Sequence, residues 1–226
     1  MEVLSNIPYE LSIDAVISRI KTREPQKHIE GVKKAAALVQ ERVTPRGLYK
    51  ICWVYPQDED AVYIDNVLFN SRVLAVNLQD AEKVFPYVLT CGKEFDELYS
   101  STGDIMEQFY LSEIANEILH RVQFSFLEYI KSTCCLEKVS RMNPGEIEEW
   151  PTEEQSKLFT LLDESEVKEK IGVELTPNLT MVPLKSMAGV MFPTETGFDS
   201  CQLCPRECPD RRAPYDEKLK EQYLYS

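Results

Sequence analysis

The 226-residue sequence is short of positive charge, of histidine and of long apolar runs. Its 25 lysines and arginines stand against 38 aspartates and glutamates, which leaves a formal net charge of -13 at pH 7. A chain so acidic repels polyanions, so we expect neither a nucleic acid nor a membrane as its partner. No apolar run approaches a membrane span in length, and the first residues, Met1 to Ser5, lack the basic start of a signal peptide. These absences predict a cytoplasmic protein.

The two histidines form no catalytic or metal-binding pattern. His28 and His120 lie far apart in the sequence, and neither has a cysteine or carboxylate neighbour at a ligand spacing. We therefore interpret both as structural residues.

The sequence does contain enough apolar material for a packed core. Hydrophobic residues make up 43% of the chain and aromatic residues 10%, a composition that argues against wholesale disorder. A length of 226 residues fits one domain, or one domain with an appendage.

Helical spacing of apolar residues predicts helices, and short runs rich in β-branched and aromatic residues predict strands. The predicted helices are a short one within 7–23, then 28–43, 71–80, 104–131, 152–162 and 165–170. The predicted strands are 48–55, 61–69, 84–90, 136–142, 172–176 and 180–192. This mixture predicts an α+β fold, with a mostly antiparallel, twisted sheet packed against long helices.

The chain is organised around the stretch 140–193. Its first feature is the loop Arg141-Met142-Asn143-Pro144-Gly145, in which the proline fixes its own φ and the glycine permits a positive φ. Such loops expose backbone N–H groups, and Arg141 adds a planar cationic donor beside them. Taken alone, the pattern fits either an ordinary turn with a surface arginine or a pocket for a ligand carboxylate.

The segments that follow the loop keep a fixed order. They read W-P at 150–151, L-F-T-L-L at 158–162, I-G-V-E-L-T at 171–176 and K-S-M-A-G at 185–189. Together with R-M-N-P-G they resemble the activation (reactivation) domain of cobalamin-dependent methionine synthase, over roughly 60–195 and most sharply over 140–190. The resemblance implies an α+β domain that binds S-adenosylmethionine and presents it to an inactivated corrinoid for reductive methylation.

The resemblance also implies which residues form the ligand site. Arg141 would bind the ligand carboxylate, the loop backbone would hold the rest of the ligand, and Lys185 and Ser186 would lie on a strand near the pocket. Phe198 falls near the position of an aromatic residue that lines the site in the family. The implied cofactor-binding set is Arg141, Met142, Asn143, Pro144, Gly145, Glu146, Lys185, Ser186 and Phe198. The chain departs from the pattern at Glu146, where the family has a tyrosine.

The sequence lacks the D-x-H-x-x-G motif by which base-off corrinoid proteins hold cobalamin. The resemblance therefore implies a stand-alone homologue, an accessory part of a methyltransferase system. Its partners would be a corrinoid-binding methyltransferase protein that carries the cobalamin and a separate electron donor. The alternative is a non-catalytic binding or assembly module of the same fold that has lost the S-adenosylmethionine site and carries a structural zinc or redox cysteine tail.

The composition changes after Thr194, and we divide the chain into an activation-domain-like part, 1–195, and a cysteine-containing extension, 196–226. Cys201, Cys204 and Cys208 supply three thiolates within eight residues, a spacing that suits an iron–sulfur cluster or zinc. The other interpretations are a zinc knuckle that only staples the tail and reduced thiols without metal. A fourth ligand would come from elsewhere, with Cys91, Cys134 and Cys135 as candidates. Neighbouring arginines would offset the negative charge of the cluster: Arg206, Arg211 and Arg212.

Overall fold

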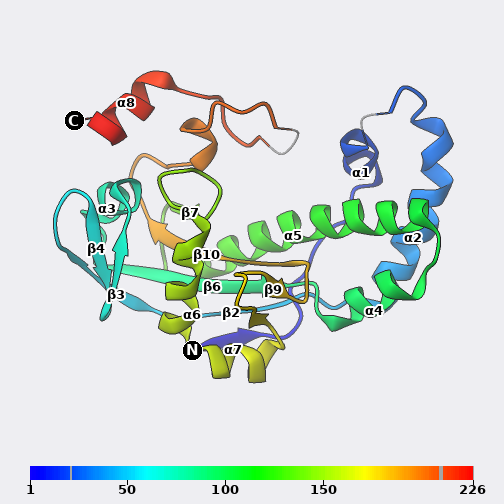
Figure 1. Cartoon of the computed structure of the whole chain (residues 1–226), viewed down its shortest axis with the longest axis horizontal. Helices are drawn as coiled ribbons and strands as arrows, with labels where there is room; N and C mark the ends of the chain where they lie inside the picture. The colour runs from blue at the N-terminus through cyan, green and yellow to red at the C-terminus, as the bar shows by residue number, and fades with distance from the viewer. Residues whose placement is uncertain (21, 209–210, 226) are drawn as a thin grey trace.

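The computed structural model describes residues 1–20, 22–208 and 211–225. An antiparallel sheet lies between two layers of helices, which confirms the predicted α+β class (Figure 1). The strands are β1 (Glu2–Leu4), β2 (Arg46–Tyr49), β3 (Cys52–Pro56), β4 (Ala61–Ile64), β5 (Val67–Asn70), β6 (Lys83–Thr90), β7 (Val139–Met142), β8 (Glu174–Leu175), β9 (Met181–Val182) and β10 (Ser186–Pro193). The α-helices are α1 (Ile13–Arg19), α2 (Gln26–Arg42), α3 (Arg72–Leu78), α4 (Lys93–Ser101), α5 (Ile105–Thr133), α6 (Gln155–Leu162), α7 (Glu164–Ile171) and α8 (Glu217–Tyr225). Two short 3-10 helices complete the set, η1 (Thr152–Glu154) and η2 (Ser200–Gln202).

Strand β6 is the centre of the sheet. It pairs with β2 and β3 along one side and with β10 on the other, and β7 pairs in turn with β10. Phe85, Tyr87 and Leu89 alternate with Val84 and Val88, and the two sets enter two different hydrophobic clusters. A strand buried on both faces reads as a continuous apolar run, which explains why its sequence predicts a buried strand.

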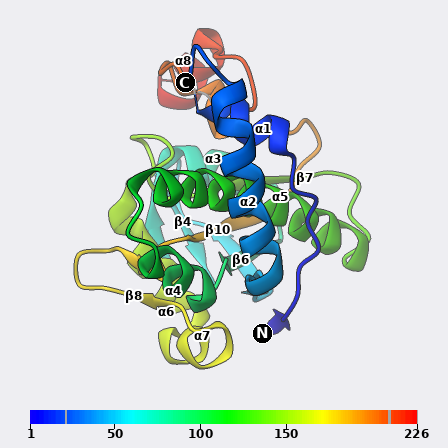
Figure 2. The same ribbon diagram turned by 90° about the vertical axis from the view of Figure 1, so that its right-hand side faces the viewer.

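The two faces of the sheet carry different helices. On one face, α1, α2, α4 and α5 share a core with β6, and α2 packs against α5 (Figure 2). On the other face, α3, α6 and α7 pack around Trp150, which is fully buried. Helix α5 begins where expected, because the side chain of Asp104 accepts a hydrogen bond from the N–H of Met106.

Several predicted elements differ in detail. The single strand expected over 48–55 is two strands, β2 and β3, interrupted at Lys50 and Ile51, although both halves still pair with β6. The strand expected over 180–192 is likewise divided, into β9 and β10. Helix α4 was not predicted. A threonine at 152 with Gln155 three residues later predicts a capping box at the start of the helix 152–162. That prediction is wrong, because Thr152 lies inside η1 and Pro151 takes the N-cap position.

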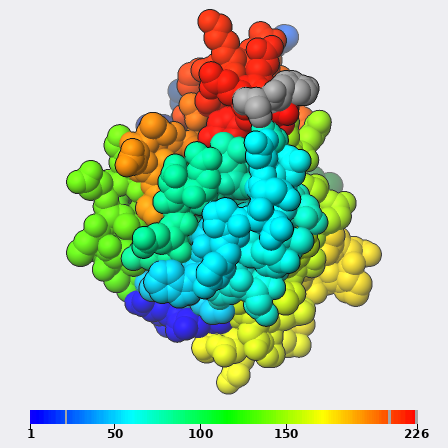
Figure 3. All heavy atoms as spheres, turned by 90° about the vertical axis from the view of Figure 1, so that its left-hand side faces the viewer, coloured from blue at the N-terminus to red at the C-terminus, as the bar shows by residue number. Residues whose placement is uncertain are grey.

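The C-terminal segment packs back onto the domain rather than trailing from it. A parallel bridge joins Asp199 to Arg141, so the segment lies beside the edge strand β7. Leu203 is fully buried in the core under α3, and Tyr223 of α8 donates a hydrogen bond to Asn77 of α3 (3.0 Å). Figure 3 shows this face, with α8 in red above β3, β4 and α3 in cyan and teal. Within the ranges that the structure describes, no helix has both the length and the apolar character needed to cross a membrane.

Candidate functional site

The predicted ligand loop begins as a strand and turns at its end. Arg141 and Met142 belong to β7, where Met142 is fully buried in the core under α3. Successive side chains of a strand point to opposite faces, so Arg141 and Asn143 lie on the α5 side of the sheet. The loop proper therefore starts at Asn143, two residues later than the sequence pattern predicts.

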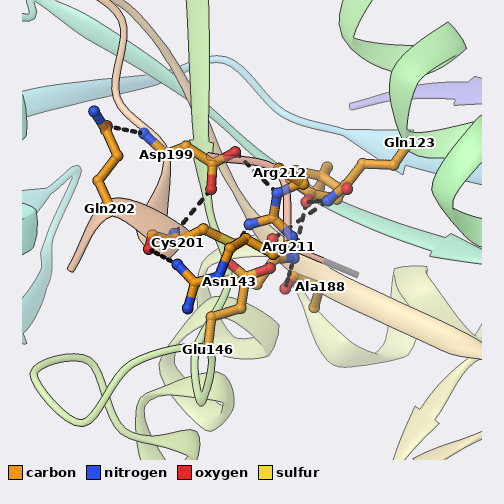
Figure 4. Close-up of polar contacts among 10 residues, drawn as sticks. Gln123, Asn143, Glu146, Ala188, Asp199, Cys201, Gln202, Arg211 and Arg212 are labelled. Carbon is orange, nitrogen blue, oxygen red and sulfur yellow. Dashed lines mark hydrogen bonds and ion pairs between the residues drawn. The ribbon is translucent and has the colours of Figure 1, made fainter. Parts of the chain in front are cut away.

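Asn143 is a buried anchor rather than a ligand-facing residue. Its Nδ2 donates hydrogen bonds to the backbone carbonyl of Ala188 (2.7 Å) and to the hydroxyl oxygen of Tyr87 (2.8 Å) (Figure 4). Gln123 of α5 donates to the same hydroxyl (2.6 Å) and to Oδ1 of Asn143 (3.3 Å). Burial raises the pKa of Tyr87 to about 12, so the phenol stays neutral. The network ties the end of β7 to β6, β10 and α5.

Two glycines allow the backbone to pass closely at this point. A Cβ atom on Gly189 would lie 2.7 Å from Nδ2 of Asn143 and still closer to the carbonyl oxygen of Met142. Gly145 has a φ of 86° and donates its N–H to the carbonyl of Trp150 (2.8 Å). Both glycines are thus required by geometry, and the positive φ expected at Gly145 is present.

Arg141 lines a shallow groove of about 350 Å³ between α5 and the C-terminal segment. The Nε atom of Arg141 is buried and has no hydrogen-bond partner among the described residues. A buried donor without a partner costs about 1–3 kcal/mol, so this atom is a natural attachment point for a ligand acceptor. The lining residues are Leu127, Val139, Ser140, Arg141, Gly197, Phe198, Asp199, Gln202 and Ala213.

Arg212 crosses from the C-terminal segment to the loop. Its guanidinium donates to Oδ2 of Asp199 (2.9 Å) and to Oε2 of Glu146 (3.2 Å) (Figure 4). Burial alone would raise the pKa of Asp199, but the hydrogen bonds from Arg212 and from the N–H of Cys201 hold it below its ordinary value. Arg212 was expected to offset the charge of a cysteine cluster; it instead forms ion pairs with two carboxylates, those of Asp199 and Glu146.

A second cleft, of about 300 Å³, lies on the other side of this bridge. It is lined by Gly145, Glu146, Ile147, Glu148, Glu149, Pro151, Thr152, Glu153, Leu203, Cys204, Pro205, Arg206 and Lys220. Glu146 lines this cleft and Asp199 lines the groove at Arg141, and Arg212 binds both. The ion pairs of Arg212 therefore join the groove at Arg141 to the cleft at Glu146.

Two predicted ligand residues, Lys185 and Ser186, do not join the groove at Arg141 as expected. Arg141 of β7 pairs with Met191 near the C-terminal end of β10. Ser186 is the first residue of β10 and Lys185 precedes it. At about 3.3 Å per residue, Lys185 lies roughly 20 Å from Met191 along the strand. Lys185 instead donates to Ser112 and Asn116 of α5.

Phe198 lines the groove but is only 9% exposed. Its ring packs against that of Tyr223 with the centroids 5.4 Å apart. Most of the ring therefore contributes to the core under α8, and little of it is available to a ligand.

The structure does not support the predicted metal centre. Among the described residues, no three histidine, cysteine, aspartate or glutamate side chains gather in a group that could hold a metal ion, Cys201, Cys204 and Cys208 included. The Arg211 guanidinium lies within the cysteine segment 201–208 instead. It donates to the carbonyls of Cys201 (3.0 Å), Cys204 (2.9 Å) and Arg206. Within the part of the chain that the structure describes, the segment that holds the cysteines is therefore organised by hydrogen bonds to Arg211 and not by a metal ion.

The candidate fourth ligands are also placed elsewhere. Cys91 is fully buried at the end of β6, and burial raises the pKa of its thiol to about 12. Cys134 and Cys135 follow the C-terminal end of α5. The Cys91 thiol, with so high a pKa, is a poor source of the thiolate that metals bind.

Sequence reasoning missed four residues of this site: Tyr87, Gln123, Asp199 and Arg212 in its present role. Only Asp199 had a local signal. Its side chain accepts from the N–H of Cys201 (2.9 Å), and the Gln202 side chain accepts from the N–H of Asp199 (3.0 Å), which is a capping box readable as D-x-x-Q. The other three come from distant parts of the chain.

No protein-family model matches the sequence, and a search of curated proteins finds no match. Among solved structures, the MetH reactivation domain bound to AdoHcy matches with a TM-score of 0.64 and 15% sequence identity. The match covers 88% of this chain and 81% of that chain. The chain therefore shares the fold of the MetH reactivation domain.

Proposed function

We propose that this protein binds S-adenosylmethionine beside Arg141 and assists the reductive methylation of a corrinoid carried by a separate protein. The shared fold with a domain bound to AdoHcy supports an adenosyl-type ligand. The observation in this chain that carries the proposal is the buried Nε of Arg141, which has no hydrogen-bond partner in the described part of the chain. A guanidinium binds a carboxylate through two parallel N–H groups, one of which is commonly Nε.

The size and charge of the groove agree with such a ligand. Its volume of about 350 Å³ falls within the range of small-molecule sites. Arg212 and Arg141 together carry two positive charges against the two negative charges of Glu146 and Asp199, so the four side chains balance and the repulsion of a ligand carboxylate is reduced. The charge of Glu146, where the family has a tyrosine, is thus compensated within the chain.

The protein would act by positioning. S-adenosylmethionine supplies the methyl group, which passes from its sulfonium to the reduced corrinoid and leaves AdoHcy, while the electron comes from a separate donor. Because this chain carries a net charge of -13, a corrinoid protein with a basic docking surface would be attracted to it. The chain would thus be an accessory part of a methyltransferase system.

Calorimetric titration of the full chain with S-adenosylmethionine and with AdoHcy tests the ligand. We expect micromolar binding that weakens about 10- to 100-fold in Arg141→Ala, since a hydrogen bond to a charged group contributes about 1.5–3 kcal/mol. Arg42→Ala, at an exposed arginine of α2, is the matched control and should bind like the wild type. Circular dichroism checks that each variant is folded. A folded wild-type protein that binds neither ligand would contradict the proposal.

The Arg212 bridge favours one alternative function. A module that no longer binds S-adenosylmethionine would need its acidic loop neutralised from within, which is what Arg212 does for Glu146. If neither the wild type nor Arg212→Ala binds either ligand, the non-catalytic binding or assembly module becomes the better description.

A further inference from the structure

The turn that holds Cys201 and Cys204 brings the two residues together. The N–H of Cys204 donates to the carbonyl of Cys201 (3.3 Å), which closes a turn of four residues. The first and fourth Cα atoms of such a turn lie within about 7 Å of each other. A disulfide needs Cα atoms about 4.4–6.8 Å apart, so the spacing of such a turn is compatible with a bridge.

This turn is held from both sides. At its start, the Asp199 side chain accepts from the N–H of Cys201, and Gln202 completes the capping box. Inside the turn, Arg211 donates to the carbonyls of Cys201 and Cys204. Because the backbone is held in this way, the two cysteines keep a spacing that is compatible with a bridge.

The pair is also more accessible than the two buried thiols of the core. Cys201 and Cys204 are partly exposed, whereas Cys52 and Cys91 are fully buried. Cys208 is exposed, and three residues lie between it and Cys204, one more than the two between Cys201 and Cys204. Burial raises the pKa of Cys201 and Arg212 opposes that effect, which suits a thiol that exchanges slowly at neutral pH and faster as the pH rises.

We propose that Cys201 and Cys204 form a reversible dithiol–disulfide pair, with a glutathione-type disulfide as oxidant. One thiolate attacks the S–S bond of the oxidant and releases a first small thiol, and the second cysteine then displaces the other. The pair loses two protons and two electrons, the oxidant gains them, and one Sγ–Sγ bond forms. This inference does not depend on the methyl-donor proposal.

Oxidation would act on the bridge beside Arg141. Asp199 caps the turn through the N–H of Cys201 and binds Arg212, which in turn binds Glu146 of the loop. A disulfide would fix the turn that carries Asp199. The oxidised form should therefore hold the C-terminal segment against the loop more firmly than the reduced form does.

The test equilibrates the reduced full chain anaerobically with a series of reduced-to-oxidised glutathione ratios, followed by acid quenching and alkylation with N-ethylmaleimide. Trypsin cleaves after Lys185 and Arg206, so one peptide holds both cysteines of the pair and Cys208 falls in the next. As oxidant increases, we expect the first peptide to escape alkylation and to have a mass about 2 Da below that of its unmodified dithiol form. The Cys208 peptide should stay alkylated at the same ratios.

Variants sharpen the outcome. Cys208→Ser should form the disulfide at the same glutathione ratio as the wild type, whereas Cys204→Ser should yield only a mixed disulfide with glutathione. Amide hydrogen exchange across η2 should slow on oxidation. The proposal fails if the pair stays alkylated at every ratio, or if Cys208 enters a disulfide before the pair does. Both results are read from the wild-type peptides, so they hold even if Cys204→Ser does not fold.

Discussion

Replacement of Gly189 by alanine probes the closest backbone approach at the site. Gly189 lies in β10 opposite Tyr87 of β6, and the end of β7 passes over its Cα. In an open strand this change would stabilise the protein by about 0.5–1 kcal/mol, since alanine loses less conformational freedom on folding than glycine does. Here the added methyl group has no room.

The structure indicates which effect is larger. The new Cβ would lie 2.7 Å from Nδ2 of Asn143 where ordinary contact begins at 3.4 Å, and the Met142 carbonyl is closer still. The backbone must therefore separate by more than about 0.7 Å, which costs about 1–3 kcal/mol, and a displaced Asn143 leaves the carbonyl of Ala188 without its donor at a further cost of about 1–3 kcal/mol. After the favourable entropy is subtracted, we expect Gly189→Ala to lose about 2–4 kcal/mol.

Urea unfolding at 25 °C and thermal unfolding measure this loss, and the melting midpoint should fall by roughly 5–15 °C for a chain of this size. Gly103→Ala is the control, because a Cβ at Gly103 meets no atom within 4 Å. That variant should match the wild type or gain up to about 1 kcal/mol. If Gly189→Ala is as stable as Gly103→Ala, the close approach of β7 and β10 described here is incorrect.

Two further substitutions test the polar contacts around the loop. Arg212→Ala should lose about 1–2 kcal/mol of unfolding free energy at pH 7, because a partly buried ion pair is broken. Since the folded-state pKa of Asp199 is lowered, this loss should be complete above about pH 4 and should shrink as the pH falls further. A difference from the wild type that stays constant in urea unfolding down to about pH 2.5 would contradict the assignment. Tyr87→Phe should lose about 1–3 kcal/mol, because the Asn143 and Gln123 amides lose a shared acceptor, and urea unfolding that shows a loss under about 0.5 kcal/mol would argue against the network.

The regular elements could be predicted because their signals are local. Helix α5 follows from apolar residues repeated at helical spacing and from Asp104 before its first turn. Helix α1 begins after Ser12, a residue type that favours the N-cap position, and the Ser12 side chain accepts a hydrogen bond from the N–H of Ala15. Strand β6 follows from an unbroken apolar run. Each signal lies within a few residues of the element that it specifies, so tertiary structure is not needed to read it.

The two capping boxes show where local reading fails. Thr152 with Gln155 has the expected pattern, yet the preceding Pro151 takes the N-cap position of a 3-10 helix and the box does not form. Asp199 with Gln202 has the same spacing and does form one, although the neighbouring cysteines drew the interpretation toward a metal site. The spacing of the two residues is the same in both cases, and the surrounding chain decides whether a capping box forms.

By itself, the sequence determined the fold class, the main helices, the central strand, and the glycines and arginine that mark the loop after β7. Only the tertiary structure decided which residues meet there. Arg212 binds Glu146 from 66 positions away, and Gln123 reaches Asn143 from a different layer of the fold. The same register that brings Asn143 to Ala188 places Lys185 at the far end of β10. Periodicity specifies the backbone of each element, but strand pairing and helix packing set the partners of a side chain, and those depend on the whole chain at once.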